Sequence, residues 1–186
     1  LDVSANTALT WLNCQVNQLT SLDISNNTGL TRLLCNVNQW DSVDVSNNAA
    51  LTNLTCSQNQ LDSLDVSNNT ALTELVIYFN QLTSLNVSNN TALTLLRCEN
   101  NQLTYLNMRN GVTDSLTTFD ATDNTSLSCI ETLDPDYATA NWTYADGNID
   151  EGVTFAVDCT PEPPTLDPPT LVINELLAQN VSCCTD

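Results

Sequence analysis

A short motif recurs along this chain at a fixed interval of 21 residues. The tetrapeptide LDVS, or a close relative of it, starts at positions 1, 22, 43, 64, 85 and 106. One full unit reads LDVSNNTALTxLxCxxNQLTS, and a degenerate sixth copy, LTTFDATDNTSL, runs from Leu116 to Leu127 with one extra residue. Self-similarity at a period of about 20–50 residues is the signature of a repeat architecture, so it constrains the fold more than any other feature.

Each unit predicts two short extended segments rather than a helix. Around Leu12 and Cys14, apolar and polar residues alternate, which is the pattern of a strand with one buried face. Leu22 and Ile24 alternate in the same way, and 21 residues leave no room for a helix with its turns. One unit cannot bury its apolar stripe alone, so the units are expected to stack into a parallel sheet at about 4.8 Å spacing.

The segment LxxLxCxxNxL occurs five times at this period: Leu9 to Leu19, Leu30 to Trp40, Leu51 to Leu61, Leu72 to Leu82 and Leu93 to Leu103. It resembles the leucine-rich repeat, L-x-x-L-x-L-x-x-N/C-x-L, with Cys at the third Leu position. The resemblance covers roughly residues 1–127 and is to the 21-residue repeat type of secreted Bacteroidota proteins. It implies a right-handed, β-rich solenoid of about six coils with a parallel sheet and little or no α-helix.

Two columns of asparagine follow the same period. The first occupies the family's ladder position, where the amide satisfies turn backbone groups that no strand can pair: Asn17, Asn38, Asn59, Asn80 and Asn101. The second is expected at the opposite corner, where Asn tolerates left-handed backbone geometry: Asn6, Asn27, Asn48, Asn69 and Asn90. We interpret both columns as structural, because buried polar groups are normally hydrogen-bonded.

The charge balance excludes several classes of partner. The chain has 22 Asp and Glu, three Arg, no Lys and no His, for a net charge of −19. Nucleic acids and anionic membranes need Lys or Arg to displace counterions, so neither is expected as a partner. The lack of His removes Ser-His and Cys-His nucleophiles and most zinc sites. No apolar run approaches the roughly 18 residues of a membrane span, and no signal peptide is present, so we expect any targeting segment to lie outside this sequence.

A column of cysteines recurs at the inward strand position: Cys14, Cys35, Cys56 and Cys98, with Ile77 in place of the fourth. A fixed period predicts a row of parallel thiols in an apolar core, with side-by-side vectors that do not face one another as a disulfide requires. Metal ligands must converge, so no metal site is predicted here. Ile77 is interpreted as a larger apolar residue filling the same core column.

The outward positions of the same strands vary while the scaffold repeats almost letter for letter. These positions follow 11, 13 and 15 at intervals of 21, and they include two of the three arginines. Aromatic and Arg side chains dominate interface energetics, so this face is the predicted ligand-binding surface, although free drift of surface residues remains an alternative. Its candidate residues are Trp11, Arg32, Leu34, Asn53, Glu74, Val76, Tyr78, Leu95, Arg97 and Glu99.

Two other surface patterns carry weaker hypotheses. The acidic column Asp2, Asp23, Asp44 and Asp65 could hold calcium, since carboxylates about 5 Å apart repel one another. However, Asn86 and Asn107 break the column, and no EF-hand or calcium-binding nonapeptide pattern is present. Asp-Ser-apolar triplets resemble the short O-glycosylation sequon of Bacteroidota, and they would place glycans on Ser42, Ser63 and Ser115.

The remainder of the chain is not periodic. Residues 128–160 resemble the capping segment that follows such repeats, and Cys129 and Cys159 bracket it. A bridge between them would stabilise the fold by about 3–4 kcal/mol in an oxidising compartment. Residues 161–170 predict a Pro-rich, semi-rigid linker. Residues 171–186 resemble the start of a lamin-tail-like module, and we expect one or both of Cys183 and Cys184 to pair elsewhere rather than with each other.

These patterns predict a non-catalytic recognition or adhesion module that binds a protein or glycan through the variable sheet face. No nucleophile–base pair and no cofactor site support an enzyme, and no carboxylate pair is placed across a cleft for glycoside hydrolysis. The alternative is a passive spacer or stalk that presents a neighbouring, possibly enzymatic, domain. We expect a secreted or cell-surface location without membrane insertion. The chain begins inside a repeat, so we expect a monomeric fragment of a larger multidomain protein.

Overall fold

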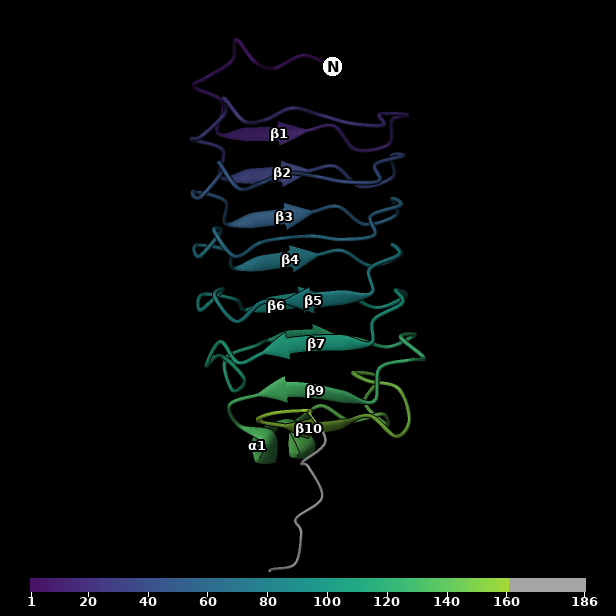
Figure 1. Cartoon of the computed structure of the whole chain (residues 1–186). Helices are drawn as coiled ribbons and strands as arrows, with labels where there is room; N and C mark the ends of the chain where they lie inside the picture. The colour runs from purple at the N-terminus through teal and green to yellow at the C-terminus, as the bar shows by residue number, and fades with distance from the viewer. Residues whose placement is uncertain (161–186) are drawn as a thin grey trace, which may run out of the picture.

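The computed structural model describes residues 1–160, which form a parallel-strand β-solenoid of about seven turns with a single short helix in that range. Figure 1 shows the turns stacked along one axis, with the N-terminus at one end and the helix α1 at the other. The predicted fold class is therefore confirmed. The linker expected at 161–170, the module expected at 171–186 and the two terminal cysteines lie outside the described residues.

One side of the solenoid is a six-stranded parallel sheet in which each strand pairs with its counterpart in the next coil. The register joins Leu12 to Leu33, Leu54, Leu75, Leu96 and Phe119. In order across the sheet the strands are β1 (Trp11–Asn13), β2 (Arg32–Leu34), β3 (Asn53–Thr55), β4 (Glu74–Val76), β6 (Leu95–Arg97) and β8 (Thr118–Asp120).

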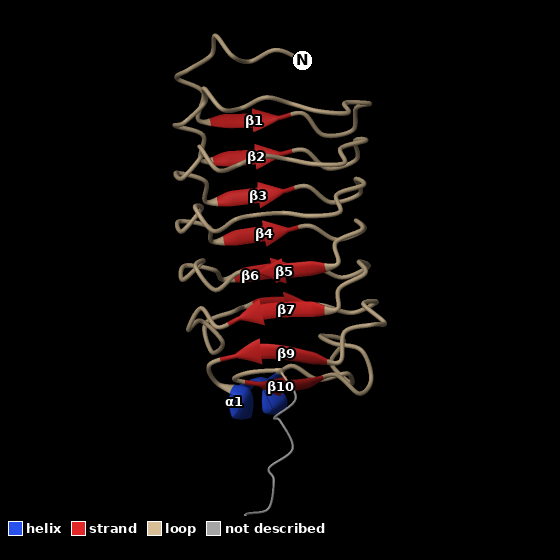
Figure 2. Cartoon of the chain, viewed as in Figure 1, coloured by secondary structure: helices blue, strands red, loops and turns tan. Residues whose placement is uncertain are grey.

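A four-stranded parallel sheet forms the second side toward the C-terminal end, while the earlier coils run there without strands (Figure 2). Its strands, in chain order, are β5 (Ser84–Asn86), β7 (Tyr105–Met108), β9 (Cys129–Thr132) and β10 (Thr154–Ala156). Because β9 pairs in register with β7, and β10 with β9, the cap continues the stack beyond the expected six coils. The helix α1 (Pro135–Asn141) is N-capped by Asp134 and carries Pro at its start.

The core between the two sides consists of the repeated apolar columns. Leu33, Leu54, Leu75 and Leu96 are fully buried, and Ile77 is fully buried within the cysteine column, as the sequence predicted. At the C-terminal end the ring of Trp142 packs between Phe119 and Phe155, at centroid distances of 4.4 and 5.9 Å. This cluster covers the last coil, which would otherwise expose its apolar stripe.

The cysteine column contains a disulfide, so the expectation of a row of free thiols is wrong at one pair. Cys35 and Cys56 are bonded, with their Cα atoms 4.9 Å apart. Adjacent coils bring equivalent residues to about the spacing that a disulfide spans, and side-by-side vectors do not prevent the bond. Among the described residues Cys14 and Cys98 are free and buried. A second disulfide joins Cys129 to Cys159 and closes the cap, with an S–S distance of 2.03 Å.

Both asparagine columns bond backbone atoms between coils. Asn38 Nδ2 donates to the carbonyls of Cys14 and Cys35, and its Oδ1 accepts from Leu19 N at 3.0 Å. Asn124, which the sequence did not predict as a ladder member, makes the equivalent contacts in the last coil. On the other corner Asn27 Nδ2 donates to the carbonyls of Val3 and Asn6. The ladders thus tie each coil to the one before it.

The left-handed backbone positions are not the ones expected. The second asparagine column has no positive φ; positive values occur at the residue that precedes each ladder asparagine. The turn after each strand needs this geometry, whereas the second column serves its corner through side-chain hydrogen bonds instead. The residues concerned are Val16, Val37, Gln58, Phe79, Asn100 and Asp123, with φ between 52° and 58°.

Candidate functional site

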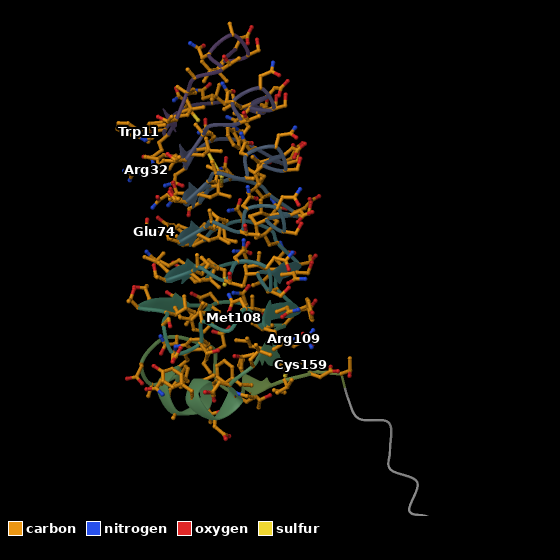
Figure 3. All side chains as sticks on the ribbon, turned by 90° about the vertical axis from the view of Figure 1, so that its left-hand side faces the viewer. Trp11, Arg32, Glu74, Met108, Arg109 and Cys159 are labelled. Atoms are coloured by element: carbon orange, nitrogen blue, oxygen red, sulfur yellow. A yellow bond between two sulfur atoms is a disulfide. The ribbon has the colours of Figure 1, made fainter. Side chains whose placement is uncertain are left out.

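The outward side chains of the six-stranded sheet form the surface that we call the variable face. It comprises positions 11, 13 and 15 and their equivalents in the following coils. The structure places all ten predicted ligand-binding residues there, and the side chains are exposed or half-buried except for Glu99. Figure 3 shows Trp11, Arg32 and Glu74 along one side of the solenoid, with Arg109 and Cys159 on the other.

At the N-terminal end of the variable face, Arg32 stacks on Trp11. The guanidinium Cζ lies 5.9 Å from the indole ring, which is within the range of a cation–π interaction. Trp11 is 57% exposed, so most of this large side chain faces solvent. Within residues 1–160, Arg32 makes no ion pair. This pair presents an apolar surface and an unneutralised cation side by side.

A second arginine–aromatic stack lies three coils further along. Arg97 Cζ is 4.7 Å from the centroid of Tyr78, and the same guanidinium forms an ion pair with Glu99. Tyr78 also contacts Phe79 edge-to-face at 5.7 Å. Tyr78 and Phe79 have no aromatic counterparts at the equivalent positions of the other repeats. They therefore form one surface cluster that distinguishes this coil.

The variable face contains buried polar groups that the alternation of the sequence did not predict. The Glu99 side chain is 5% exposed, and its Oε2 has no hydrogen-bond partner. Burial raises the pKa of Glu99, and the nearby Asp120 also raises it, although the Glu99 backbone and Arg97 oppose the shift. Ser57 occupies the position of Tyr78 in the preceding coil. It is fully buried, and its hydroxyl has no hydrogen-bond partner. The long side chains on this face fold over their neighbours, which a pattern of alternating residues cannot show.

A row of exposed apolar side chains borders the variable face at the turns. Val16 is 74% exposed, Phe79 51% and Val37 40%, and all three adopt the left-handed conformation. A β-branched residue is a genuine outlier in that conformation, and Asn or Gly would fit with less strain. The row extends the apolar surface that Trp11 and Tyr78 provide.

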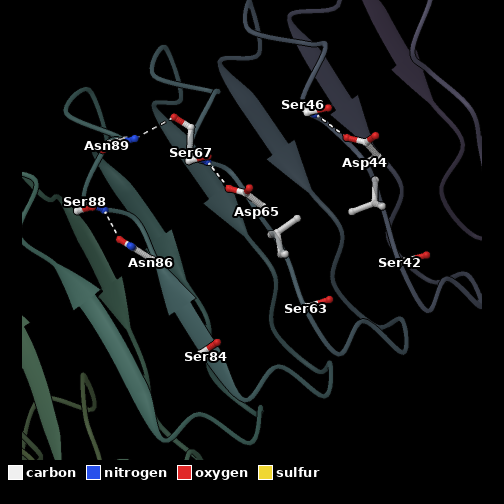
Figure 4. Close-up of a pocket in the computed structure, with 12 residues that line it drawn as sticks. Ser42, Asp44, Ser46, Ser63, Asp65, Ser67, Ser84, Asn86, Ser88 and Asn89 are labelled. Carbon is white, nitrogen blue, oxygen red and sulfur yellow. Dashed lines mark hydrogen bonds between the residues drawn. The ribbon is translucent and has the colours of Figure 1, made fainter.

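The opposite side of the solenoid carries a shallow groove lined by repeated serines and acids (Figure 4). The carboxylate of Asp44 accepts a hydrogen bond from Ser46 N, and that of Asp65 from Ser67 N, as the amide oxygen of Asn86 does from Ser88 N. Hydrogen bonds from the serine side chains and amides lower the pKa of Asp23, Asp44 and Asp65. In the described residues no three His, Cys, Asp or Glu side chains converge as a metal site would require.

The three serines of the proposed glycosylation triplets are exposed, and each donates its hydroxyl hydrogen bond to the preceding aspartate. Ser42 and Ser63 line this groove, and Ser115 directly precedes the last repeat, which begins at Leu116. These hydroxyls are accessible, and glycosylation of Ser42, Ser63 and Ser115 remains a prediction.

The third arginine has a structural position that sequence reasoning missed. Arg109 Nη2 lies 3.0 Å from the buried carboxylate of Glu131, which also accepts a hydrogen bond from the Tyr105 hydroxyl at 3.0 Å. This network joins β7 to β9, the strand that begins at the disulfide-bonded Cys129. The signal that could have found it is the pairing of an isolated Arg with an isolated Glu in consecutive coils.

The fold of the described residues, a parallel-strand β-solenoid, matches the leucine-rich repeat folds of the internalins. No protein-family model and no curated protein match the sequence. Two of the solved structures that are similar to this chain come from Listeria monocytogenes. The functional domain of InlJ, described as including a cysteine ladder, is 35% identical with a TM-score of 0.53, over 71% of this chain and 36% of that one. An internalin, InlF, is 22% identical with a TM-score of 0.61, over 86% of this chain and 44% of that one.

The present chain thus spans less than half the length of either solved structure. Its own cysteine column, Cys14 to Cys98, is the feature that compares with the ladder described for InlJ. The assignment to the Bacteroidota repeat type stays a prediction. Within residues 1–160 no helix is both long and apolar enough to cross a membrane.

Proposed function

We propose that this chain is a non-catalytic recognition or adhesion module that binds a protein or glycan through the variable face. The observation that carries the proposal is the contrast between a scaffold that repeats in every coil and a surface that differs in every coil. Two arginines stacked on aromatic rings lie on that surface, and such side chains are enriched at binding hot spots. The similarity to internalin leucine-rich repeats supports the same class of function.

The two disulfides support an oxidising location, and we propose that the module is secreted or held at the cell surface. The rival proposal is a passive spacer that presents a neighbouring domain. A spacer has no reason to expose Trp11, Val16 and Phe79, because apolar surface of this kind favours association. Exposure of this apolar surface therefore favours recognition over a purely mechanical role.

Peptide and glycan arrays test the proposal directly. The intact chain should bind a defined subset of array spots, and the triple variant Trp11→Ala, Tyr78→Ala, Arg97→Ala should lose that binding by at least about tenfold, as expected for two or three hot-spot side chains. The matched control is Ser42→Ala, Ser63→Ala, Ser84→Ala in the groove on the opposite side. Circular dichroism and thermal unfolding would verify that both variants fold. Array binding that survives the first triple variant would contradict recognition through the variable face, and a chain that binds no array spot would favour the spacer.

A further inference from the structure

Charge is distributed unevenly along the variable face. In its first three coils, residues 11–16, 32–37 and 53–58 contain no Asp or Glu, and Arg32 is the single charged side chain. The acids of these coils lie elsewhere: Asp2, Asp23, Asp41, Asp44, Asp62 and Asp65. In a protein of net charge −19, this is a region from which negative charge is absent. It is also where Arg32 lies over the exposed ring of Trp11 without an acidic partner in residues 1–160.

The last three coils of the same face have the opposite sign. Glu74, Glu99, Asp120 and Asp123 lie in residues 74–79, 95–100 and 118–123, and Arg97 is the single cation among them. Glu99 already neutralises Arg97 through their ion pair, so the remaining carboxylates set the local charge. The variable face is therefore dipolar along the solenoid axis.

Glu99 provides a separate observation, because one of its carboxylate oxygens lacks a hydrogen-bond donor. Only 5% of its side chain is exposed, and the carboxylate atom Oε2 has no hydrogen-bond partner. Its other oxygen accepts a hydrogen bond from Arg97, whose guanidinium lies on the ring of Tyr78. A buried carboxylate oxygen without a donor is costly, and a donor from a bound partner would relieve that cost.

We propose that the variable face binds a polypeptide segment of a partner protein that carries an Asp or Glu over Arg32 and a Lys or Arg over the Glu74–Asp120 region. This inference rests on the proposed function and names the ligand class of the same surface. Strands are about 4.8 Å apart, so Arg32 and Glu74 are about 10 Å apart across the sheet and Arg32 and Asp120 about 19 Å. An extended peptide rises about 3.3 Å per residue, which places its two charges roughly three to six residues apart.

Both signs of charge distinguish a polypeptide from a glycan as the ligand. A neutral glycan carries no charge that could pair with Arg32 or with the carboxylates of the last three coils. A polyanionic glycan would contact Arg32 but would be repelled by Glu74, Asp120 and a net charge of −19. Complementary charges of both signs also fix the direction in which the segment lies on the face.

Selection from a displayed library of random peptides of about 12 residues, long enough for the spacing above, tests the proposal on the intact chain. Enriched peptides should carry an acid and a base three to six positions apart. The variants Arg32→Gln and Glu74→Gln should each weaken binding of the best peptide roughly tenfold, the effect of about one lost charge contact. Asp44→Asn and Asp65→Asn are the controls, because Asn86 shows that an amide keeps the hydrogen bond to the serine amide.

A charge exchange gives the sharpest outcome. The double variant Arg32→Glu, Glu74→Arg should select peptides in which the order of acid and base is reversed. Enrichment of peptides without this charge pair, or unchanged selection by the double variant, would overturn the proposed ligand class. If binding still depends on Trp11 and Tyr78 in that case, or if glycans bind and peptides do not, recognition by the face stands and only the ligand class fails. If no change on this face alters any binding, both proposals fail.

Discussion

The guanidinium of Arg97 lies over the ring of Tyr78, with its Cζ 4.7 Å from the ring centroid. Because the same guanidinium pairs with the buried carboxylate of Glu99, one arginine links a half-buried aromatic ring to an acid that has almost no contact with water. This arrangement makes the C-terminal half of the variable face sensitive to the ionisation of a single group.

Replacement of Glu99 by Gln should change how stability depends on pH. Burial raises the pKa of Glu99 above its ordinary value of 4.5, so between that value and the raised folded-state pKa the native protein binds more protons than the unfolded chain. The wild type should therefore lose stability relative to Glu99→Gln as pH rises through this window. Urea unfolding of both proteins at several pH values measures the difference, and parallel stability curves would contradict the assignment.

Replacement of a buried ladder asparagine should lower the free energy of unfolding more than most other single substitutions. Asn80→Ala removes three donated bonds, to the carbonyls of Cys56, Ile77 and Tyr78, and one accepted from Leu61 N. Buried backbone groups then lack partners, and the free energy of unfolding should fall by about 2–4 kcal/mol. The control is Asn68→Ala, whose exposed side chain makes one long bond and which should change stability by less than about 0.5 kcal/mol. Equal effects in chemical denaturation would show that the ladder is not essential.

The repeat period was sufficient to predict the solenoid, because the stacking of coils follows from the spacing alone. It also located the variable face, since strand alternation decides which side chains point outward. It failed where side chains of neighbouring coils interact. The Cys35–Cys56 bond, the burial of Glu99 and the contact of Arg97 with Tyr78 all depend on rotamers and on residues 19 or more positions apart. The left-handed conformation of Val16 was also not predicted, because the intrinsic backbone preference at such a position favours Asn over Val.

The cysteines should separate into two chemical classes. Peptide mapping without reduction should recover Cys35 linked to Cys56 and Cys129 linked to Cys159. Burial raises the pKa of the Cys14 and Cys98 thiols, so both should resist iodoacetamide until a denaturant is added. The double variant Cys35→Ala, Cys56→Ala should lose about 3 kcal/mol for a loop of this length in the chain-entropy model. Rapid native-state alkylation of Cys98, which is fully buried, would be incompatible with this core.

Replacement of Val16 by Asn should stabilise the protein, although it removes an apolar side chain. Val16 has a φ of 55°, and its side chain is 74% exposed, so the change relieves backbone strain while giving up little buried area. We expect a gain of about 0.5–1 kcal/mol in the free energy of unfolding. Val157→Asn is the matched control, because this valine is 51% exposed and does not have a positive φ. A gain at Val16 with weaker peptide binding would mean that the strained valine serves recognition. No gain at Val16, or an equal gain at Val157, would remove backbone strain as the explanation.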